Sequence, residues 1–428
     1  MKNRKALALI AIIALVAAAC GGADEVVEEE VVETTEAPAT TEAPAETTAP
    51  ASDPLVLASL MPLSGDLASL GPGIALGAAI AVEQINAAGG INGQPVVLIE
   101  GDSGCDGAVA LTSLNDVIAQ GAQGVMGAAC SGTSLAILDT AIAAEVVMVS
   151  PSNTSPQFTK IDKKGFYART APSDLLQGDV LASLLVEDGV QTVSIISRAD
   201  SYGRGLAEAT AAAFEAAGGT VKTIVYHATD ASEFTSEVTA VGKGGADAIV
   251  GILFPETGCG VLQPAFEQGL LDTPWYMTDG VKDAGLASLC GLGTALDGFK
   301  GTAPGSAAGE AKDAFEAAYA EVSADGSPTF IFAPQAYDAV MLMAISAAAN
   351  GVTGPEIASG LVAASSGGEK CIGVACIALA ADGVDVDYVG ASGEIELNAV
   401  GDPTAATYDI WTTEGDTNPV LKSVDFGS

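Results

Sequence analysis

The chain has 428 residues, with 54 acidic against 16 basic side chains and a formal net charge of −38. A charge of this sign and size repels nucleic acid and anionic lipid surfaces, so both are excluded as partners. Hydrophobic residues make up 49% and aromatic residues only 5% of the chain, which leaves ample apolar material for two packed domains.

The first 19 residues have the layout of an export signal. Basic residues precede an unbroken apolar run that starts at Ala6, and this run is too short to span a bilayer comfortably. Small residues then lead to Cys20, an order that resembles the lipobox of bacterial lipoproteins, although Ala17 stands where Leu or Val is usual. We expect a signal peptide over 1–19 and a lipid on Cys20, with ordinary cleavage as the alternative.

Residues 20–52 form an acidic segment rich in Thr, Pro and Ala. It contains the unit TTEAPA twice and has no Lys or Arg. Such a segment cannot bury a core, so we expect a disordered tether between an anchor and a domain. A tail that binds a specific partner is the alternative interpretation.

From residue 55 onward, apolar runs typical of strands alternate with segments that have the period of amphipathic helices. The first series of alternating strands and helices predicts strands at 55–63, 95–102, 124–128 and 146–150, with helices at 75–90, 108–119 and 134–144. The second run predicts helices at 175–187, 204–217, 233–241 and 259–268, with strands at 192–197, 221–226 and 246–253. Two successive β/α runs indicate an α/β fold with two doubly wound parallel sheets.

Four loops of this pattern are candidates for a ligand site. In doubly wound sheets the ligand lies beyond the carboxyl ends of the strands, which selects PLSGDLASLG, CSGTS, SPSNTSP and FPETG. These loops are rich in hydroxyl groups and glycine, and the helices that follow them offer free N–H groups to an anion. Ser131, Thr133 and Thr154 are therefore expected to be able to hold a carboxylate together.

Six cysteines remain after Cys20, and an even number in an exported chain argues for three disulfides. Fifteen pairings are possible, but pairing neighbours in sequence gives the shortest loops: Cys105 with Cys130, Cys259 with Cys290, and Cys371 with Cys376. Each bond is expected to contribute about 2–4 kcal/mol to stability. A zinc site is not expected, because the chain has one histidine and CIGVAC has no second close cysteine pair.

The sequence offers little support for an enzyme. The run GPGIALG resembles a dinucleotide fingerprint, but about eight residues separate it from the preceding strand where the fingerprint needs a tight turn. The one histidine, His227, has no indicated nucleophilic partner, and no nucleophile elbow or P-loop occurs. We therefore expect no cofactor and no catalysis; an exported redox enzyme using Cys371 and Cys376 is the enzymatic alternative.

The motifs of the domain, taken together and in order, resemble those of the leucine/isoleucine/valine-binding protein family, the type I periplasmic binding proteins that feed ABC importers. The resemblance runs from about residue 55 to the C-terminus and rests on MPLSGDLASLG, INAAGGINGQPV, GDSGCD, GAACSGTS, MVSPSNTSP, FYARTAPSD, DSYGRG and FPETG. It implies an extracytoplasmic lipoprotein, anchored to the outer face of the cytoplasmic membrane, that passes an amino acid to an ABC permease. A monomer is usual for this resemblance.

The resemblance also implies roles for individual residues. Ser131 and Thr154 resemble the residues that hold the ligand α-carboxylate. Ser152 resembles a residue whose backbone contacts the ligand near its α-ammonium group. Tyr202 resembles the aromatic residue that closes over the ligand, and Glu256 resembles the acid that pairs with the ammonium group. Each also has a plain structural interpretation: a helix cap for Ser131 and Thr154, interlobe packing for Tyr202, and a first-turn acid for Glu256.

Three further residues are pocket candidates: Leu70, Asp279 and Phe332. Leu70 stands where relatives often carry a bulky aromatic residue, and Phe254 replaces a tyrosine, which favours an apolar amino acid, branched-chain or otherwise. Amides, urea or small carboxylates are the alternative ligands, and a ligand sensor for a membrane receptor is the alternative function.

The resembled fold divides the domain into two lobes with three crossings between them. Lobe 1 is expected over 53–171 and 301–398, and lobe 2 over 172–300 and 399–428. In the resembled family a disulfide joins the segments of Cys105 and Cys130. None of the three expected disulfides joins the two lobes, which leaves them free to close on a ligand.

Overall fold

A computed structural model of the protein describes residues 53–327 and 329–426. The predicted signal peptide over 1–19, the lipidated Cys20 and the tether over 20–52 lie outside the described residues. The described part forms one compact unit by itself.

The first sheet has five parallel strands in the order β2-β1-β3-β4-β5. Its strands are β1 Val56–Met61, β2 Val97–Asp102, β3 Gly124–Gly127, β4 Val147–Ser150 and β5 Tyr167–Arg169. The helices between them are α1 Gly71–Ala87, α2 Gly107–Ala119, α3 Ser131–Ala143 and the short α4 Gln157–Lys160. Strands β3 and β4 are buried throughout, which explains why they appear as continuous apolar runs in the sequence.

The second sheet has seven strands in the order β15-β14-β10-β9-β8-β6-β7. Its strands are β6 Thr192–Arg198, β7 Thr220–His227, β8 Ala248–Ile252, β9 Trp275–Met277, β10 Lys300–Pro304, β14 Ala406–Thr412 and β15 Val420–Phe426. Its helices and 3₁₀ turns are α5 Asp174–Glu187, α6 Ser201–Ala216, α7 Thr235–Gly242, α8 Pro255–Glu267, η1 Leu270–Asp272, η2 Asp279–Val281, α9 Leu286–Leu289 and η3 Gly293–Leu296. The predicted α/β fold with two sheets is confirmed, but β14 and β15 run antiparallel and make this sheet mixed.

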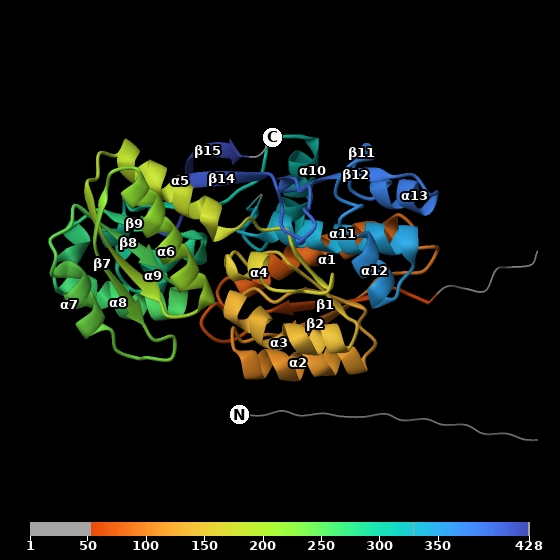
Figure 1. Cartoon of the computed structure of the whole chain (residues 1–428), viewed down its shortest axis with the longest axis horizontal. Helices are drawn as coiled ribbons and strands as arrows, with labels where there is room; N and C mark the ends of the chain where they lie inside the picture. Colours follow the sequence, from red (N-terminus) through yellow and green to blue (C-terminus); the bar gives the residue numbers. More distant parts are fainter. Residues whose placement is uncertain (1–52, 328, 427–428) are drawn as a thin grey trace, which may run out of the picture. The chain divides into compact units, whose positions relative to one another are not determined.

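The remaining elements cover the first sheet and the connections between the sheets. They are α10 Glu310–Val322, α11 Ala333–Asn350, α12 Gly354–Gly360, α13 Ala375–Ala381 and a small sheet of β11 Glu369–Ile372, β12 Val386–Gly390 and β13 Gly393–Glu394. In Figure 1, α2 and α3 lie on one face of the first sheet, and α1 and α11 lie on the other. Helix α11 is buried along 15 consecutive residues, Ala333–Ala347, so it forms the centre of this layer.

Helix α1 starts four residues before the predicted start at 75. Pro72 stands in its first turn, where a missing N–H costs nothing. Gly71 is required by close packing, because a Cβ there would lie 1.8 Å from the carbonyl oxygen of Pro62. The glycines of GPGIALG therefore serve packing: a Cβ on Gly77 would lie 2.1 Å from the carbonyl oxygen of Ala333 in α11.

All three predicted disulfides are present in the structure. Their Cα–Cα distances are 5.5 Å for Cys105–Cys130, 4.9 Å for Cys259–Cys290 and 5.3 Å for Cys371–Cys376. Each one joins segments on the same side of the predicted lobe division. The lobe boundaries stay a prediction, with one adjustment: β10 pairs with β9 and β14 of the second sheet, so the predicted start of the returning lobe 1 segment at 301 is a few residues early.

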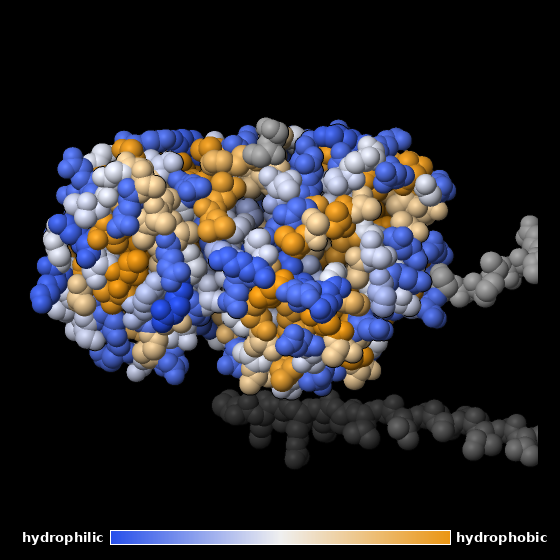
Figure 2. All heavy atoms as spheres, in the orientation of Figure 1, coloured by the Kyte–Doolittle hydropathy of each residue, from blue (hydrophilic) through white to orange (hydrophobic). Residues whose placement is uncertain are grey.

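The surface is largely hydrophilic (Figure 2), as the excess of charged acidic residues leads one to expect. Figure 2 shows hydrophilic residues over much of the visible face, interrupted by small apolar areas. Among the residues that the structure describes, no helix is long and apolar enough to cross a membrane.

Candidate ligand-binding site

A small pocket lies where loops from the carboxyl ends of both sheets meet. It is lined by Leu67, Leu70, Ile74, Ala129, Ser131, Ser152, Tyr202, Phe254, Asp279, Gly280 and Phe332. Its free space of about 20 Å³ has room for roughly one water molecule. An organic ligand therefore enters only when the two sets of loops separate, and it then replaces contacts that the closed pocket makes with itself.

The pocket has one end suited to an anion. Ser131 is the first residue of α3, and no side chain caps this helix, so its first N–H groups are available. The hydroxyl of Ser131 accepts a hydrogen bond of 3.4 Å from the amide of Ser155, and the hydroxyl of Ser152 donates one of 3.2 Å to the carbonyl of Ala129. Because both serines line the pocket, this end presents hydroxyl groups and backbone donors together.

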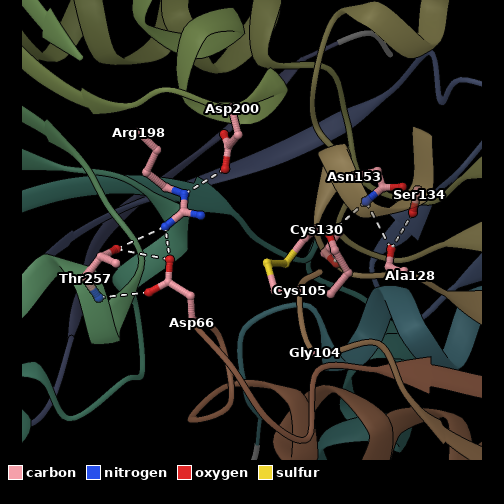
Figure 3. Close-up of a disulfide and its surroundings, with 12 residues drawn as sticks. Asp66, Gly104, Cys105, Ala128, Cys130, Ser134, Asn153, Arg198, Asp200 and Thr257 are labelled. Carbon is pink, nitrogen blue, oxygen red and sulfur yellow. Dashed lines mark hydrogen bonds and ion pairs between the residues drawn. A yellow bond between two sulfur atoms is a disulfide. The ribbon is translucent and has the colours of Figure 1, made fainter. Parts of the chain in front are cut away.

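The loop that carries these serines is held rigidly. The Cys105–Cys130 disulfide fixes the residue immediately before Ser131. On the other side, the Asn153 side chain donates a hydrogen bond of 3.0 Å to the carbonyl of Ala128 (Figure 3) and one of 2.7 Å to the carbonyl of Ala129. The start of α3 is therefore positioned before any ligand arrives.

Thr154 lies next to this loop but does not line the pocket. It is fully buried, and its hydroxyl lies beside Asp174, whose charged form it favours, but makes no well-formed hydrogen bond within the described part of the protein. Thr133 is also buried, in the first turn of α3, and it too lies outside the lining. An unused buried hydroxyl at Thr154 is a donor that a small shift of the loop would bring to a ligand.

The pocket holds one acidic side chain, Asp279, the first residue of η2. Its Oδ1 accepts hydrogen bonds of 2.8 Å from the Gln177 side chain and 3.0 Å from the Tyr202 hydroxyl. Burial raises the pKa of Asp279 to about 6, although both hydrogen bonds favour the charged form. Such an acid gains from a neighbouring cation that restores its charge.

A second acid, Asp174, stands behind Asp279 at the start of α5. Burial and the charge of Asp279 together raise its pKa well above its ordinary value. Both oxygens of Asp174 are buried, and the nearby Thr154 hydroxyl favours the charged form without offsetting the burial. Burial thus disfavours the charged form of both carboxyl groups, and a cation beside them would favour it.

The opposite wall of the pocket is apolar and aromatic. Tyr202 and Phe254 stack with ring centroids 5.3 Å apart, and Leu70 and Phe332 face the same space. Phe332 adopts a left-handed backbone conformation, with φ of 61°, which is rare for a bulky residue and is found mainly at functional sites. These four side chains are nearly fully buried, so they define an apolar compartment.

Glu256 does not line the pocket. It lies in the first turn of α8 with its side chain partly accessible, and its Oε1 accepts a hydrogen bond of 3.2 Å from the amide of Ser69. Burial raises the pKa of Glu256 as well. The geometry thus favours Asp279 over Glu256 as the acid of the site. Leu70, Ser131, Ser152, Tyr202, Asp279 and Phe332 come together as lining residues, whereas Thr154 and Glu256 stay outside.

Some contributors had no role predicted from the sequence: the lining residues Leu67, Ile74, Ala129 and Gly280, and Asp174 behind the lining. Asp174 follows the helix-capping Ser173, so it looks like an ordinary first-turn acid. Nothing in the local sequence distinguishes it, since the nearby Arg169 is a plausible charge partner for it. His227 is buried at the end of β7 with its ring edge against Phe234, which is a structural position. The described residues contain no group of three or more His, Cys, Asp or Glu that could hold a metal ion.

Comparison with known proteins agrees with this architecture. A family model described as periplasmic binding protein matches residues 54–370. The chain belongs to the periplasmic binding protein family. Members of this family bind solutes outside the cytoplasm and are not enzymes, so this periplasmic binding protein is a binding protein and not a catalyst.

Two relatives in Pseudomonas aeruginosa are similar in sequence to this periplasmic binding protein. An amino acid binding protein is 34% identical over 238 residues, which cover 54% of this chain and 62% of the relative. A leucine-, isoleucine-, valine-, threonine- and alanine-binding protein is 29% identical over 304 residues, covering 69% of this chain and 78% of the relative. The match to the first relative therefore spans less than two thirds of its length.

Solved structures share the fold of this periplasmic binding protein. A leucine binding protein from Thermotoga maritima superposes with a TM-score of 0.73 at 21% identity, covering 86% of this chain and 98% of the other. A solute binding protein from R. palustris in complex with benzoate has a TM-score of 0.70 at 18% identity, covering 88% and 98%. At these identities the similarity establishes the type I fold of two α/β lobes.

Proposed function

We propose that this chain is the substrate-binding component of an ABC importer and binds an apolar amino acid, foremost a branched-chain one, in the pocket between the lobes. The observation that carries the proposal is the composition of the lining, in which a helix N-terminus with serines, a buried acid and an apolar compartment meet. An apolar amino acid needs donors for its carboxylate, an acid for its ammonium group and an apolar space for its side chain.

In this proposal the ligand carboxylate lies at the start of α3. The free N–H groups and the hydroxyls of Ser131 and Ser152 would replace its hydration shell. Thr154, whose buried hydroxyl makes no well-formed hydrogen bond in the described structure, would add a donor once the loops move. The Cys105–Cys130 disulfide keeps this end in place, so little ordering is required on binding.

The ligand ammonium group lies beside Asp279, with Asp174 behind it. Its positive charge would lower the pKa of both acids again and convert the buried pair from an unfavourable arrangement into an ion pair. Tyr202 would orient Asp279 through the hydrogen bond that already joins them. The role that resemblance gave to Glu256 is thereby transferred to Asp279.

The ligand side chain occupies the apolar compartment. Leu67, Leu70, Ile74, Phe254 and Phe332 supply aliphatic and aromatic contacts without a polar group. Burying a Leu-sized side chain there is worth about 1.5–3 kcal/mol. A charged or amide side chain would lose its hydration without compensation, so the pocket discriminates in favour of apolar amino acids.

Delivery to a permease completes the proposal. The relatives named for leucine, isoleucine and valine support a role in uptake of such amino acids. We propose that Cys20 carries a lipid, that residues 20–52 are the tether, and that the lobe domain is a monomer that hands its ligand to the membrane permease. A sensor that presents the closed form to a receptor is the alternative.

A plain carboxylate is the second candidate ligand. It is favoured by one observation, the raised pKa of Asp279, because a neutral acid needs no cationic partner. The R. palustris protein solved with benzoate has the same fold. The two candidates differ in whether the ligand carries an ammonium group.

A thermal-shift screen of residues 53–428 tests the proposal. The panel contains the twenty amino acids, urea, short amides, and acids that match the amino acids but lack the amino group. Ligand at 100 times its Kd stabilises a protein by about 2.7 kcal/mol, which raises the melting temperature by a few degrees. We expect shifts with leucine, isoleucine or valine and none with their deaminated analogues. Shifts with the analogues alone would overturn the amino acid assignment.

A further inference from the structure

Asp66 reaches from the loop after β1 to the start of α8 in the other sheet. Its Oδ1 accepts a hydrogen bond of 2.8 Å from the amide of Thr257, and its Oδ2 accepts one of 3.1 Å from the Thr257 hydroxyl. The Arg198 guanidinium forms an ion pair with the same carboxylate, as Figure 3 shows. Asp66, Arg198 and Thr257 are called the latch below.

Helix α8 has no cap of its own. The residue before it, Phe254, supplies no capping side chain. The first N–H groups of a helix carry its positive dipole end and need acceptors. Asp66 provides such an acceptor from a residue 191 positions earlier in the chain. The cap of α8 is therefore present only while the loops of the two sheets are together.

Arg198 has an ion-pair partner in both the closed and the open arrangement of the loops. Its side chain is only 3% exposed and also pairs at 2.8 Å with Asp200, the N-cap residue of the helix that follows β6. If the loops separate, Arg198 keeps Asp200 while Asp66, with a side chain already 17% exposed, returns to water. No charge is left buried without a partner, so opening does not meet the penalty of a broken buried pair.

The latch is also connected to the pocket wall. The guanidinium carbon of Arg198 lies 3.8 Å from the ring centroid of Phe254, a close cation–π contact. Phe254 lines the pocket and stacks on Tyr202, whose hydroxyl bonds Asp279. Arg198 thereby holds the aromatic wall against the ligand compartment.

We propose that the latch of Asp66, Arg198 and Thr257 sets how long the closed lobes retain their ligand. Arg198 is also a positioning residue for Phe254. The proposal rests on the proposed function, since the retained ligand is the one in this pocket. The ligand leaves only when the lobes open, and opening must break these contacts, so the latch slows release.

Release kinetics of the ligand found in the screen test the latch. A charge-assisted hydrogen bond is worth about 1.5–3 kcal/mol, so Asp66→Ala should speed release about tenfold to a hundredfold in stopped-flow measurements. Asp66→Asn keeps a neutral acceptor for Thr257 and should fall between the wild type and Asp66→Ala. Association should not become slower in Asp66→Ala, because the ligand enters the open form that the latch opposes.

Two comparisons separate the latch from a general loss of stability. Asp200→Asn removes the other partner of Arg198, the N-cap residue of α6, and should lower the melting temperature without a matching increase in release rate. Arg198→Lys keeps the charge and should restore most of the retention lost in Arg198→Gln. Equal release rates for the wild type and Asp66→Ala would overturn the proposal.

Hydrogen exchange of the ligand-free domain tests the latch without knowledge of the ligand. Residues 53–428 contain the compact unit, and peptides that cover the first turn of α8 report the Thr257 amide. These amides should exchange faster in Asp66→Ala than in the wild type, while peptides from α2 stay unchanged. If no ligand is found but this difference appears, the proposed function fails and the latch stands; identical exchange contradicts the latch.

Discussion

The Tyr202 hydroxyl donates a hydrogen bond of 3.0 Å to Asp279 Oδ1, so the aromatic wall and the buried acid of the pocket act as one unit. The same hydroxyl is 2.9 Å from the Thr278 hydroxyl. Asp279 also accepts a bond from Gln177 of α5, and its side chain is therefore fixed from both sides. A ligand ammonium group would meet an acid whose position is set in advance, which reduces the cost of binding.

Removal of the Asp279 charge should abolish recognition of the amino group. Truncating one member of a buried charge pair costs about 2–5 kcal/mol, so Asp279→Asn should weaken amino acid binding at least about 30-fold in calorimetric titrations. Glu256→Gln is the matched control and should bind within about twofold of the wild type. If Glu256→Gln weakened binding and Asp279→Asn did not, the ammonium group would be bound by Glu256.

Binding should depend on pH because of the same acid. Burial raises the pKa of Asp279 to about 6, and burial with the charge of Asp279 raises that of Asp174. An ammonium ligand needs the ionised acid, so affinity should fall as the pH drops from 7.5 to 5, with proton release on binding. Titrations at pH 5.5 in two buffers of different ionisation enthalpy count these protons, and a pH-independent affinity would contradict the ion pair.

The unliganded domain should show the opposite trend in stability. Between about pH 4 and 6 the folded state keeps a proton on Asp279 that the unfolded state has lost. Its contribution to the free energy of unfolding therefore falls as the pH rises through this window. Denaturant titrations of the wild type and Asp279→Asn, compared at pH 4.5 and 7, measure this contribution; the variant should lack it.

The Cys105–Cys130 disulfide should matter for both stability and binding. It closes a loop of 25 residues, for which chain entropy predicts about 3 kcal/mol. The double variant Cys105→Ser/Cys130→Ser should lose stability and bind more weakly, because Ser131 loses its support. Removing Cys371–Cys376, with a separation of five, should cost about 2 kcal/mol and leave binding unchanged. If removing either disulfide weakened binding equally, the ligand carboxylate would not lie at Ser131.

A buried ion pair ties the last crossing segment to the first sheet. Arg169 is fully buried and bonds Asp402 through Nε at 2.9 Å and Nη2 at 3.0 Å. Asp402→Asn should lower the free energy of unfolding by about 3–5 kcal/mol, because Arg169 keeps its charge without a counterpart. The exposed pair Lys370 and Glu394 is the control: Glu394→Gln should leave the denaturation midpoint unchanged.

The fold could be predicted from the sequence because its strongest signals are local. Continuous apolar runs such as Val147–Ser150 and glycine-terminated helices define the β/α order without knowledge of contacts. The disulfides followed from an even cysteine number and short loops. The antiparallel edge of the second sheet did not follow, since the pairing of β14 with β10 joins Trp411 to Gly301, more than 100 residues apart.

The site could be predicted in part. Ser131, beyond the carboxyl end of a strand, follows from topology, whereas Ser152 was assigned by the resemblance. The resemblance gave the ammonium role to Glu256 and made Asp279 only a pocket candidate. Both acids follow strands of the second sheet, and only the direction of the chain after each strand decides which acid faces the pocket. Asp66 escaped notice because its partners, Arg198 and Thr257, are 132 and 191 positions away.

A crystal structure of residues 53–428 with the amino acid found in the screen tests the central claim most directly. The account predicts the ligand between the two sheets, with its carboxylate at the start of α3, its ammonium group beside Asp279 and its side chain against Leu70 and Phe332. An ammonium group beside Glu256, or a ligand outside this pocket, would contradict the account.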